Sequence, residues 1–203
     1  MYSFYFFIIK CSVGCVFLKK RYYLQLLREK DKLLNKIILD NIRLKKELEY
    51  YKRSNYTDSL TKLYNRRIID NSHDYSAVVF ADIDYFKVIN DKYGHDCGDK
   101  VLIEVSKLLK QIIDENDIPC RWGGEEFVIL VKKNNKNSPI ELANKMKKHL
   151  QLLKEKFGFP ITMSIGISYI KNDDIKEAII EADDAMYESK NQGRNKISIY
   201  KLK

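Results

Sequence analysis

Residues 121–127 read RWGGEEF, and the apolar segments on both sides of them are typical of strands. We predict a tight hairpin here, in which Gly123 and Gly124 adopt the positive-φ backbone that favours glycine. The apolar run FVILV at residues 127–131 predicts a buried strand, which would hold Glu125 and Glu126 at a strand edge. A solvated acidic turn is the simpler interpretation of this motif taken alone.

A second pair of acids ends an apolar strand upstream. Residues 77–84 read AVVFADID, and the period of two places Asp82 and Asp84 on one face. Carboxylates at the end of a buried strand, facing an acidic hairpin, suit Mg²⁺, which takes few protein carboxylates and adds substrate phosphates. Asp82, Glu125 and Glu126 are the candidate ligands. The alternative is that a strand-ending acid, Asp84 above all, caps the following turn.

Several motifs in order along the chain resemble the GGDEF family, which makes cyclic di-GMP from two molecules of GTP. The resemblance spans residues 54–203, and the agreement of many motifs at compatible spacing makes chance implausible, although each motif alone would be weak. The motifs are DSLTKLYNRR (58–67), DIDYFKVIND (82–91), GHDCGD (94–99), GGEEF (123–127), SIGIS (164–168), ADDAMY (182–187), Lys190 and GRN (193–195).

The resemblance implies a metal site and a catalytic role for the acids. Asp82, the Ile83 carbonyl and Glu125 would hold Mg²⁺ or Mn²⁺, with Glu126 beside them, in agreement with the ligands proposed from the residues themselves. Glu125 is our candidate for bridging metal ions or assisting deprotonation. The reaction implied is attack by the 3′-hydroxyl of one GTP on the α-phosphorus of another, with release of pyrophosphate.

The resemblance also implies a GTP site. Asn90 and Asp99 would read the guanine edge, and an Asp accepts from guanine N1 and N2 but finds no donor at adenine N1, so a related cyclase that uses ATP is less favoured. An alternative for Asp99 is the N-cap of a helix expected to start there. The other implied substrate contacts are Phe86, Lys87, Lys190 and Arg194. Lys190 and Arg194 would stabilise charge on the pyrophosphate, or else be solvated charges at a helix end.

A symmetric product needs two sites face to face, so we expect a homodimer. A heptad pattern over residues 27–51 predicts a parallel coiled coil, with Asn41 as the buried polar residue that fixes register. Its a positions are Leu27, Leu34, Asn41 and Leu48, and its d positions are Lys30, Ile37, Leu44 and Tyr51. A single amphipathic helix packed on its own domain is the alternative.

Charge divides the chain into three parts: residues 1–18, 19–53 and 54–203. Residues 19–53 contain 12 Lys and Arg against 5 acids, a surplus of +7 in a total of +9, so the remainder is near neutral and no nucleic-acid-binding face is expected. The basic segment fits either anionic lipid or a solvated coiled-coil exterior. Residues 1–18 are apolar around a central Lys10, and we expect a short membrane anchor that leaves the catalytic domain in the cytoplasm. The four cysteines suit a reducing compartment.

Residues 54–203 are expected to form one α+β domain, with helices against one face of a mainly antiparallel sheet. The resemblance implies the ferredoxin-like palm of nucleotide cyclases and polymerases. Helices are predicted at 58–71, shortly after Asp84, from Asp99, from a capping box at Ser138, and at 175–191. Strands are predicted up to Asp82, on both sides of the Gly-Gly hairpin, at 160–169 and at 196–200.

One departure from the family pattern carries an expectation. The product-binding Arg-x-x-Asp of many members keeps its acid as Asp117 but has Asp114 in place of the Arg, so we expect weak or absent product inhibition through that site. Lys62 replaces a usual Gly.

Alternatives from other functional classes are a catalytically silent domain that binds GTP or a partner, and a lipid-binding basic coiled coil joined to an inert domain. The intact Asp82, Glu125 and Glu126 argue against the silent domain, whereas the lipid-binding alternative predicts that deleting residues 1–53 removes all function.

Overall fold

The structure is a computed structural model that describes residues 2–133 and 138–201; the side chains of residues 1–19, 49, 52–54 and 71 lie outside the description. The chain divides into two compact units, Met1–Arg53 and Ser54–Lys203. Each is described by itself below.

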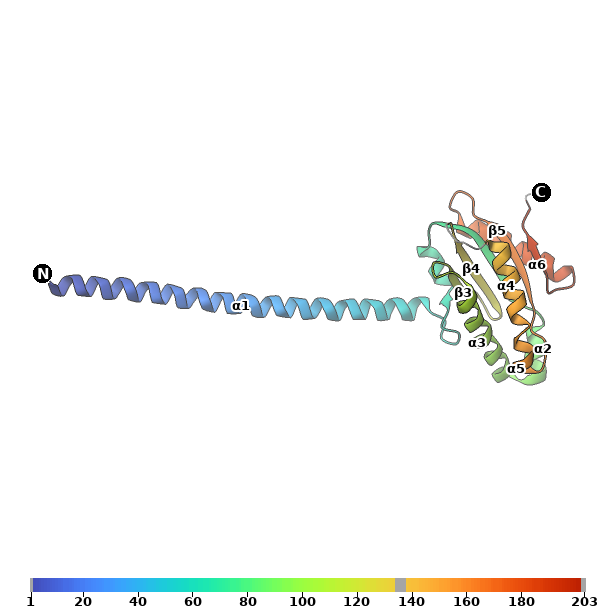
Figure 1. Ribbon diagram of the computed structural model, residues 1–203, viewed down its shortest axis with the longest axis horizontal. Coiled ribbons are helices and arrows are strands. Elements are labelled where there is room, and N and C mark those ends of the chain that lie inside the picture. The colour runs from blue at the N-terminus through green and yellow to red at the C-terminus, as the bar shows by residue number, and fades with distance from the viewer. Residues whose placement is uncertain (1, 134–137, 202–203) are drawn as a thin grey trace. The chain divides into compact units, whose positions relative to one another are not determined.

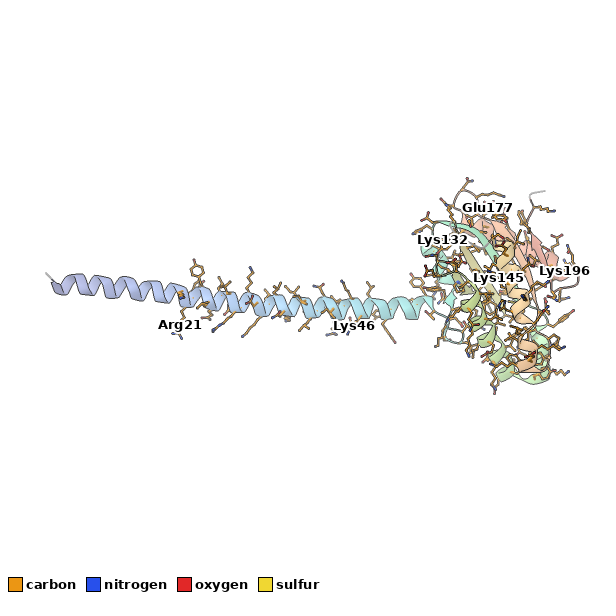
Figure 2. All side chains as sticks on the ribbon, in the orientation of Figure 1. Arg21, Lys46, Lys132, Lys145, Glu177 and Lys196 are labelled. Carbon is orange, nitrogen blue, oxygen red and sulfur yellow. The ribbon has the colours of Figure 1, made fainter. Side chains whose placement is uncertain are left out.

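Helix α1 (Tyr2–Tyr56) forms the first unit and is continuous (Figure 1). Its described side chains up to residue 51 are all exposed, and Figure 2 shows Arg21 and Lys46 projecting from it. The apolar residues of the predicted heptads are about half exposed, from 48% for Ile37 to 62% for Tyr51. These exposed fractions fit a coiled-coil helix preceding the domain. The amide of Asn41 donates to the Ile37 carbonyl over 2.9 Å within the helix.

In the part of the chain that the structure describes, no helix has an apolar stretch long enough to cross a membrane. The anchor predicted at residues 1–18 is not supported by this result, and the side chains of that segment are among those not described.

The second unit is built on one six-stranded sheet in the order β1-β3-β4-β2-β5-β6. The three central pairings are antiparallel, whereas β1 pairs parallel to β3 and β5 parallel to β6 at the two edges. The strands are β1 (Tyr64–Asn65), β2 (Tyr75–Ile83), β3 (Ile118–Arg121), β4 (Glu126–Lys132), β5 (Met163–Tyr169) and β6 (Ile197–Ile199). The α+β palm predicted from the sequence is confirmed.

Helices cover both faces of the sheet. On β2, Ala77, Val79 and Ala81 face a core shared with α3 and α4, while Val78 and Phe80 face a second core shared with α6. The prediction of helices on one face was therefore wrong. Burial on both faces explains why β2 is an uninterrupted apolar run rather than an alternating one. The helices are α2 (Phe86–Tyr93), α3 (His95–Ile112), α4 (Pro139–Leu150), α5 (Leu153–Phe157) and α6 (Ile175–Asn191).

Two predicted helix starts differ from the structure. Residues 58–71 form no α-helix: they contain a turn, the short β1 and a 3₁₀ helix, η1 (Arg66–Asn71), capped by the Asn65 side chain. Helix α3 begins four residues before Asp99, so Asp99 lies inside the helix and is not its N-cap. The capping box of α4 is confirmed, since Ser138 and Glu141 exchange both hydrogen bonds.

The hairpin between β3 and β4 forms, but not through the backbone that we expected. Neither Gly123 nor Gly124 is among the described residues with positive φ. A Cβ at Gly123 would lie 2.5 Å from Oε2 of Glu126, so a larger residue there would displace the carboxylate of that acid. The Trp122 amide donates to the Glu126 carbonyl over 2.8 Å and closes the hairpin.

Candidate active site

The end of β2 brings a buried acid to the acidic hairpin. Asp82 is 5% exposed, and its Cα is paired in register with that of Glu126 on β4. Beyond it, the Ile83 amide donates to the Glu125 carbonyl over 3.2 Å. The structure therefore brings Asp82, Ile83, Glu125 and Glu126 together where the end of β2 meets the start of β4.

Lys190 reaches this acidic cluster from the last turn of α6. Its Nζ lies 2.8 Å from Oδ2 of Asp82, and the lysine side chain is 27% exposed. A half-buried ammonium bonded to a buried carboxylate is more than a solvated charge at a helix end, so that alternative for Lys190 is set aside. The pair leaves the ammonium beside the edge where both hairpin acids lie.

The electrostatics of the cluster are dominated by burial and by the crowding of acids. Burial raises the pKa of Asp82, Glu125 and Asp84 raise it further, and Lys190 opposes them. Burial also raises the pKa of Glu126, followed by the charges of Asp82 and Asp183. The cluster thus carries more negative charge than Lys190 alone compensates, which favours a cation.

Asp84 has a structural role that the sequence left open. It is 4% exposed and accepts three hydrogen bonds: from the Thr162 and Ser164 hydroxyls, each over 2.6 Å, and from the Asn195 amide over 3.0 Å. These bonds tie the end of β2 to β5 and to the turn between α6 and β6. Asp84 therefore does not point with Asp82 toward the hairpin, and it positions the turn that contains Arg194.

That turn presents Arg194 near the end of β2. Gly193, Arg194 and Asn195 all have positive φ, with values of 106°, 61° and 48°. The Arg194 guanidinium lies over the ring of Tyr85, 4.6 Å from its centroid. Tyr85 itself has φ 57° and precedes α2. A cation–π contact between two strained segments gives the guanidinium a defined place, and sequence analysis did not identify Tyr85 as part of the site.

The residues proposed to read guanine lie on α2 and α3. Asn90 Oδ1 is buried and accepts no hydrogen bond from any described residue. It lies so close to Gly98 that a Cβ there would be 1.9 Å away, with the ring edge of Phe86 at 3.1 Å. Asp99 is exposed on the next position of α3, and Lys87 is exposed on the first turn of α2. An acceptor that is buried yet unbonded is costly unless a ligand supplies the donor.

Arg121 fixes the hairpin to the start of the domain. Its guanidinium donates to the Gly124 carbonyl over 2.8 Å and to Asp58 over 3.1 Å. Burial alone would raise the pKa of Asp58, but hydrogen bonds from Thr61 and the pair with Arg121 outweigh it, and the pKa is lowered. This link between the DSLT and GGEEF motifs was not predicted, although both motifs were singled out.

Asp117 is occupied within the fold. Its side chain is 6% exposed and accepts from the Asp114 amide over 3.3 Å and from the Lys132 amide over 3.0 Å. Both carboxylate oxygens thus serve the turn before β3 and the end of β4. Weak product inhibition through this position stays a prediction.

The cluster offers hard oxygen ligands but not a complete metal cage. Among the described residues, no three acidic, histidine or cysteine side chains are grouped so that they could hold a metal ion by themselves. The predicted set contains three carboxylates, those of Asp82, Glu125 and Glu126, together with the Ile83 carbonyl. The three carboxylates are not grouped closely enough to form a metal site by themselves, so substrate phosphates would have to complete it, as is usual for Mg²⁺. The crowded acids at the sheet edge fit that chemistry.

Asp183 is a further acid near the cluster that sequence analysis did not assign. Burial and the neighbouring Asp184 raise its pKa, and Lys190 opposes them. It lies seven residues before Lys190, two turns along α6, in the ADDAMY motif. That spacing was the one signal that could have identified it.

Comparisons with known proteins agree with this geometry. The model of the family described as "Diguanylate cyclase, GGDEF domain" matches residues 55–196. Diguanylate cyclase DgcM of Escherichia coli strain K12 is 34% identical over 181 residues, which cover 82% of this chain and 44% of that protein. The chain spans less than half the length of the curated relatives that it matches.

Two solved structures are similar over most of the chain. Diguanylate cyclase SiaD of Pseudomonas aeruginosa, solved with its activator SiaC, has a TM-score of 0.77 at 26% identity and covers 95% of this chain and 80% of its own. The coiled coil and GGDEF domain of DgcB from Caulobacter crescentus, solved with c-di-GMP, has a TM-score of 0.69 at 25% identity. The match covers 83% of this chain and 98% of the DgcB chain. The chain belongs to the GGDEF domain family of diguanylate cyclases.

Proposed function

We propose that this protein is a diguanylate cyclase that condenses two molecules of GTP to cyclic di-GMP and pyrophosphate. The observation that carries the proposal is the ion pair of Lys190 with Asp82, whose Cα is paired with that of Glu126. It brings the cation that we propose for phosphate binding next to the acids that we propose as metal ligands. Family membership supports the same activity.

GTP would be selected by its base. Asn90 Oδ1 is a buried acceptor in need of a donor, and the guanine edge has donors at N1 and N2. Asp99, one position after Gly98 on α3, would accept from the same edge. Adenine has an acceptor at N1, so ATP would leave these acceptors unpaired, which is the type of mismatch that gives strong discrimination.

The triphosphate would be held by Lys190 and Arg194, with Lys87 as a further contact. Without substrate, Lys190 neutralises Asp82. If phosphate oxygens bound the Lys190 ammonium, the carboxylate of Asp82 would be free to hold a metal ion together with Glu125 and the Ile83 carbonyl. Lys190 and Arg194 then stabilise the charge that develops on the leaving pyrophosphate.

The hairpin acids would act on the attacking hydroxyl. Glu125 and Glu126 are held by the closed hairpin and by the Arg121 clamp at Gly124. Glu125 would orient or deprotonate the 3′-hydroxyl. A bound Mg²⁺ or Mn²⁺ would neutralise charge on the reacting phosphate and lower the pKa of that hydroxyl.

Two such sites must face each other for a product with two phosphodiester links, so we propose that the active form is a homodimer. The half-exposed apolar seam of α1 supports assembly through this helix. Specific activity should then rise with protein concentration until the dimer is saturated, and sedimentation equilibrium should give the same midpoint. A concentration-independent specific activity from a monomer would contradict the proposal.

The function is tested by pyrophosphate release from the full chain with Mg²⁺ and either GTP or ATP. We expect release from GTP at least 100-fold faster than from ATP, and a loss of at least 100-fold with Asp82→Asn. The matched control is Asp173→Asn, which removes an exposed acid remote from the cluster that pairs only with Lys133 among the described ion pairs. GTP binding without release in the parent would instead support a silent binding module.

A further inference from the structure

A polar cavity of the second unit is lined by Asn55, by residues at the start of η1 and by the start of the hairpin. It has a volume of about 490 Å³. That volume is within the range of small-molecule sites. The residues that matter for its chemistry are Arg66, Arg67, Arg121, Trp122, Asn55 and Asp58.

The cavity has surplus positive charge. Three arginines line it against one acid, and that acid, Asp58, is already committed to Arg121 at 3.1 Å. Arg66 and Arg67 are exposed and form no ion pair with any residue in the described ranges. Two uncompensated guanidiniums on adjacent residues of one wall are an attractive site for an anion with several oxygens.

Hydrogen bonds hold the segment that contains Arg66 and Arg67 in place. The Asn65 side chain accepts from the Arg67 amide over 3.0 Å and donates to the Asn55 carbonyl over 2.8 Å. Asn65 therefore fixes the start of η1 against Asn55. Trp122 also lines the cavity and packs in a T-shaped arrangement against the buried Phe80, with ring centroids 6.2 Å apart. The lining thus combines cationic donors with an aromatic side chain.

We propose that this cavity binds a phosphate-bearing small anion, with Arg66 and Arg67 as the principal ligands. The site is separate from the one formed by Lys190 and Arg194, and the proposal does not depend on cyclase activity. Gly123 also lines the cavity, two residues before Glu125, so a bound anion contacts the hairpin that holds the proposed catalytic acids. We therefore expect an anion bound in this cavity to alter the position of the hairpin acids, and with it the rate of any reaction that they catalyse.

The chain has a built-in reporter, because Trp122 is its only tryptophan. We would excite the full chain at the tryptophan band and titrate pyrophosphate, inorganic phosphate and a nucleoside diphosphate without divalent metal. Sodium chloride at equal ionic strength is the blank. A saturable change with pyrophosphate is expected, weakened at least tenfold in Arg66→Gln/Arg67→Gln. Calorimetry would give the dissociation constants of the nucleoside diphosphate and of pyrophosphate. Tighter binding of the nucleoside diphosphate would identify a nucleotide ligand, and tighter binding of pyrophosphate a free phosphate ligand.

Two matched variants make the result decisive. Lys148→Gln/Lys154→Gln removes the same charge from exposed positions on α4 and α5, and this variant should bind pyrophosphate like the parent. Lys190→Gln disables the proposed triphosphate contact and should also retain the change. The proposal is overturned if no saturable change occurs, if the arginine variant binds like the parent, or if Lys190→Gln alone abolishes the signal. Thermal unfolding of each variant checks that its fold is intact.

Discussion

Gly98→Ala separates the stability of the domain from its base recognition. A Cβ at this position would lie 1.9 Å from Asn90 Oδ1, about 1.1 Å inside the 3.0 Å that real contacts respect. The ring edge of Phe86 at 3.1 Å restricts the escape on one side. The Asn90 side chain must therefore rotate away from its present position, and the buried acceptor that we assign to guanine is lost.

The two effects of this change have opposite signs. Gly98 lies inside α3, where Ala is a better helix former than Gly by about 0.5–1 kcal/mol. Because the Asn90 side chain is only partly buried, its rotation into solvent costs little. The melting temperature should therefore stay level or rise. The loss of one or two hydrogen bonds to the base should lower kcat/KM for GTP about 10–100-fold, mainly through KM.

The assay is steady-state pyrophosphate release over a range of GTP concentrations, with thermal unfolding measured in parallel. Asn90→Ala should give a similar loss, and the double variant should be no worse than either single one, because both remove the same contact. Lys100→Ala, an exposed position two residues further along α3, is the control for helix composition. A Gly98→Ala protein with normal KM, or losses that add in the double variant, would refute the reasoning.

Three further changes test other parts of the account. Asp84→Asn places an amide donor against the Asn195 amide and should displace Arg194. We expect the KM for GTP to rise by a larger factor than kcat falls. A fall in kcat with unchanged KM would contradict the positioning role of Asp84. Lys62→Gly should stabilise the protein by about 0.5 kcal/mol in urea unfolding, because Lys62 has φ 57°; a lower stability would show that the left-handed backbone is not strained there. For Asp58, whose folded pKa is lowered, the stabilisation is present above its unfolded pKa and lost as pH falls through the folded value. The stability difference between parent and Asp58→Asn should therefore shrink below about pH 4 in urea titrations, and a gap that persists to pH 2 would contradict this.

Local sequence signals predicted the parts of the fold that depend on them. The apolar runs of β2 and β4 and the capping box at Ser138 are each sufficient in their own stretch, and all three are present. The start of α3 was misplaced because Gly94, with φ 85°, ends α2 and begins α3 at one residue, so no polar cap marks the boundary. The sequence did not show that helices cover the second face of the sheet. Which face a helix such as α6 covers depends on tertiary packing against the strands, here against Val78 and Phe80.

The candidate site divides in the same way. Period two correctly placed Asp82 at the hairpin, but it could not show that Asp84 turns to Thr162, Ser164 and the Asn195 amide, which are distant in sequence. The partners of a carboxylate are set by tertiary packing, which no spacing rule contains. Arg121 is the same case, since its contact with Asp58 joins residues 63 positions apart.

The most direct test of the central claim is the mass of the product that the full chain forms from GTP and Mg²⁺. The account predicts cyclic di-GMP from the parent and from a control with an exposed acid removed, Glu177→Gln on α6, and no product from Glu125→Ala/Glu126→Ala. A product that persists without both hairpin acids, or a parent that binds GTP at dimer-saturating concentration and forms none, would contradict it.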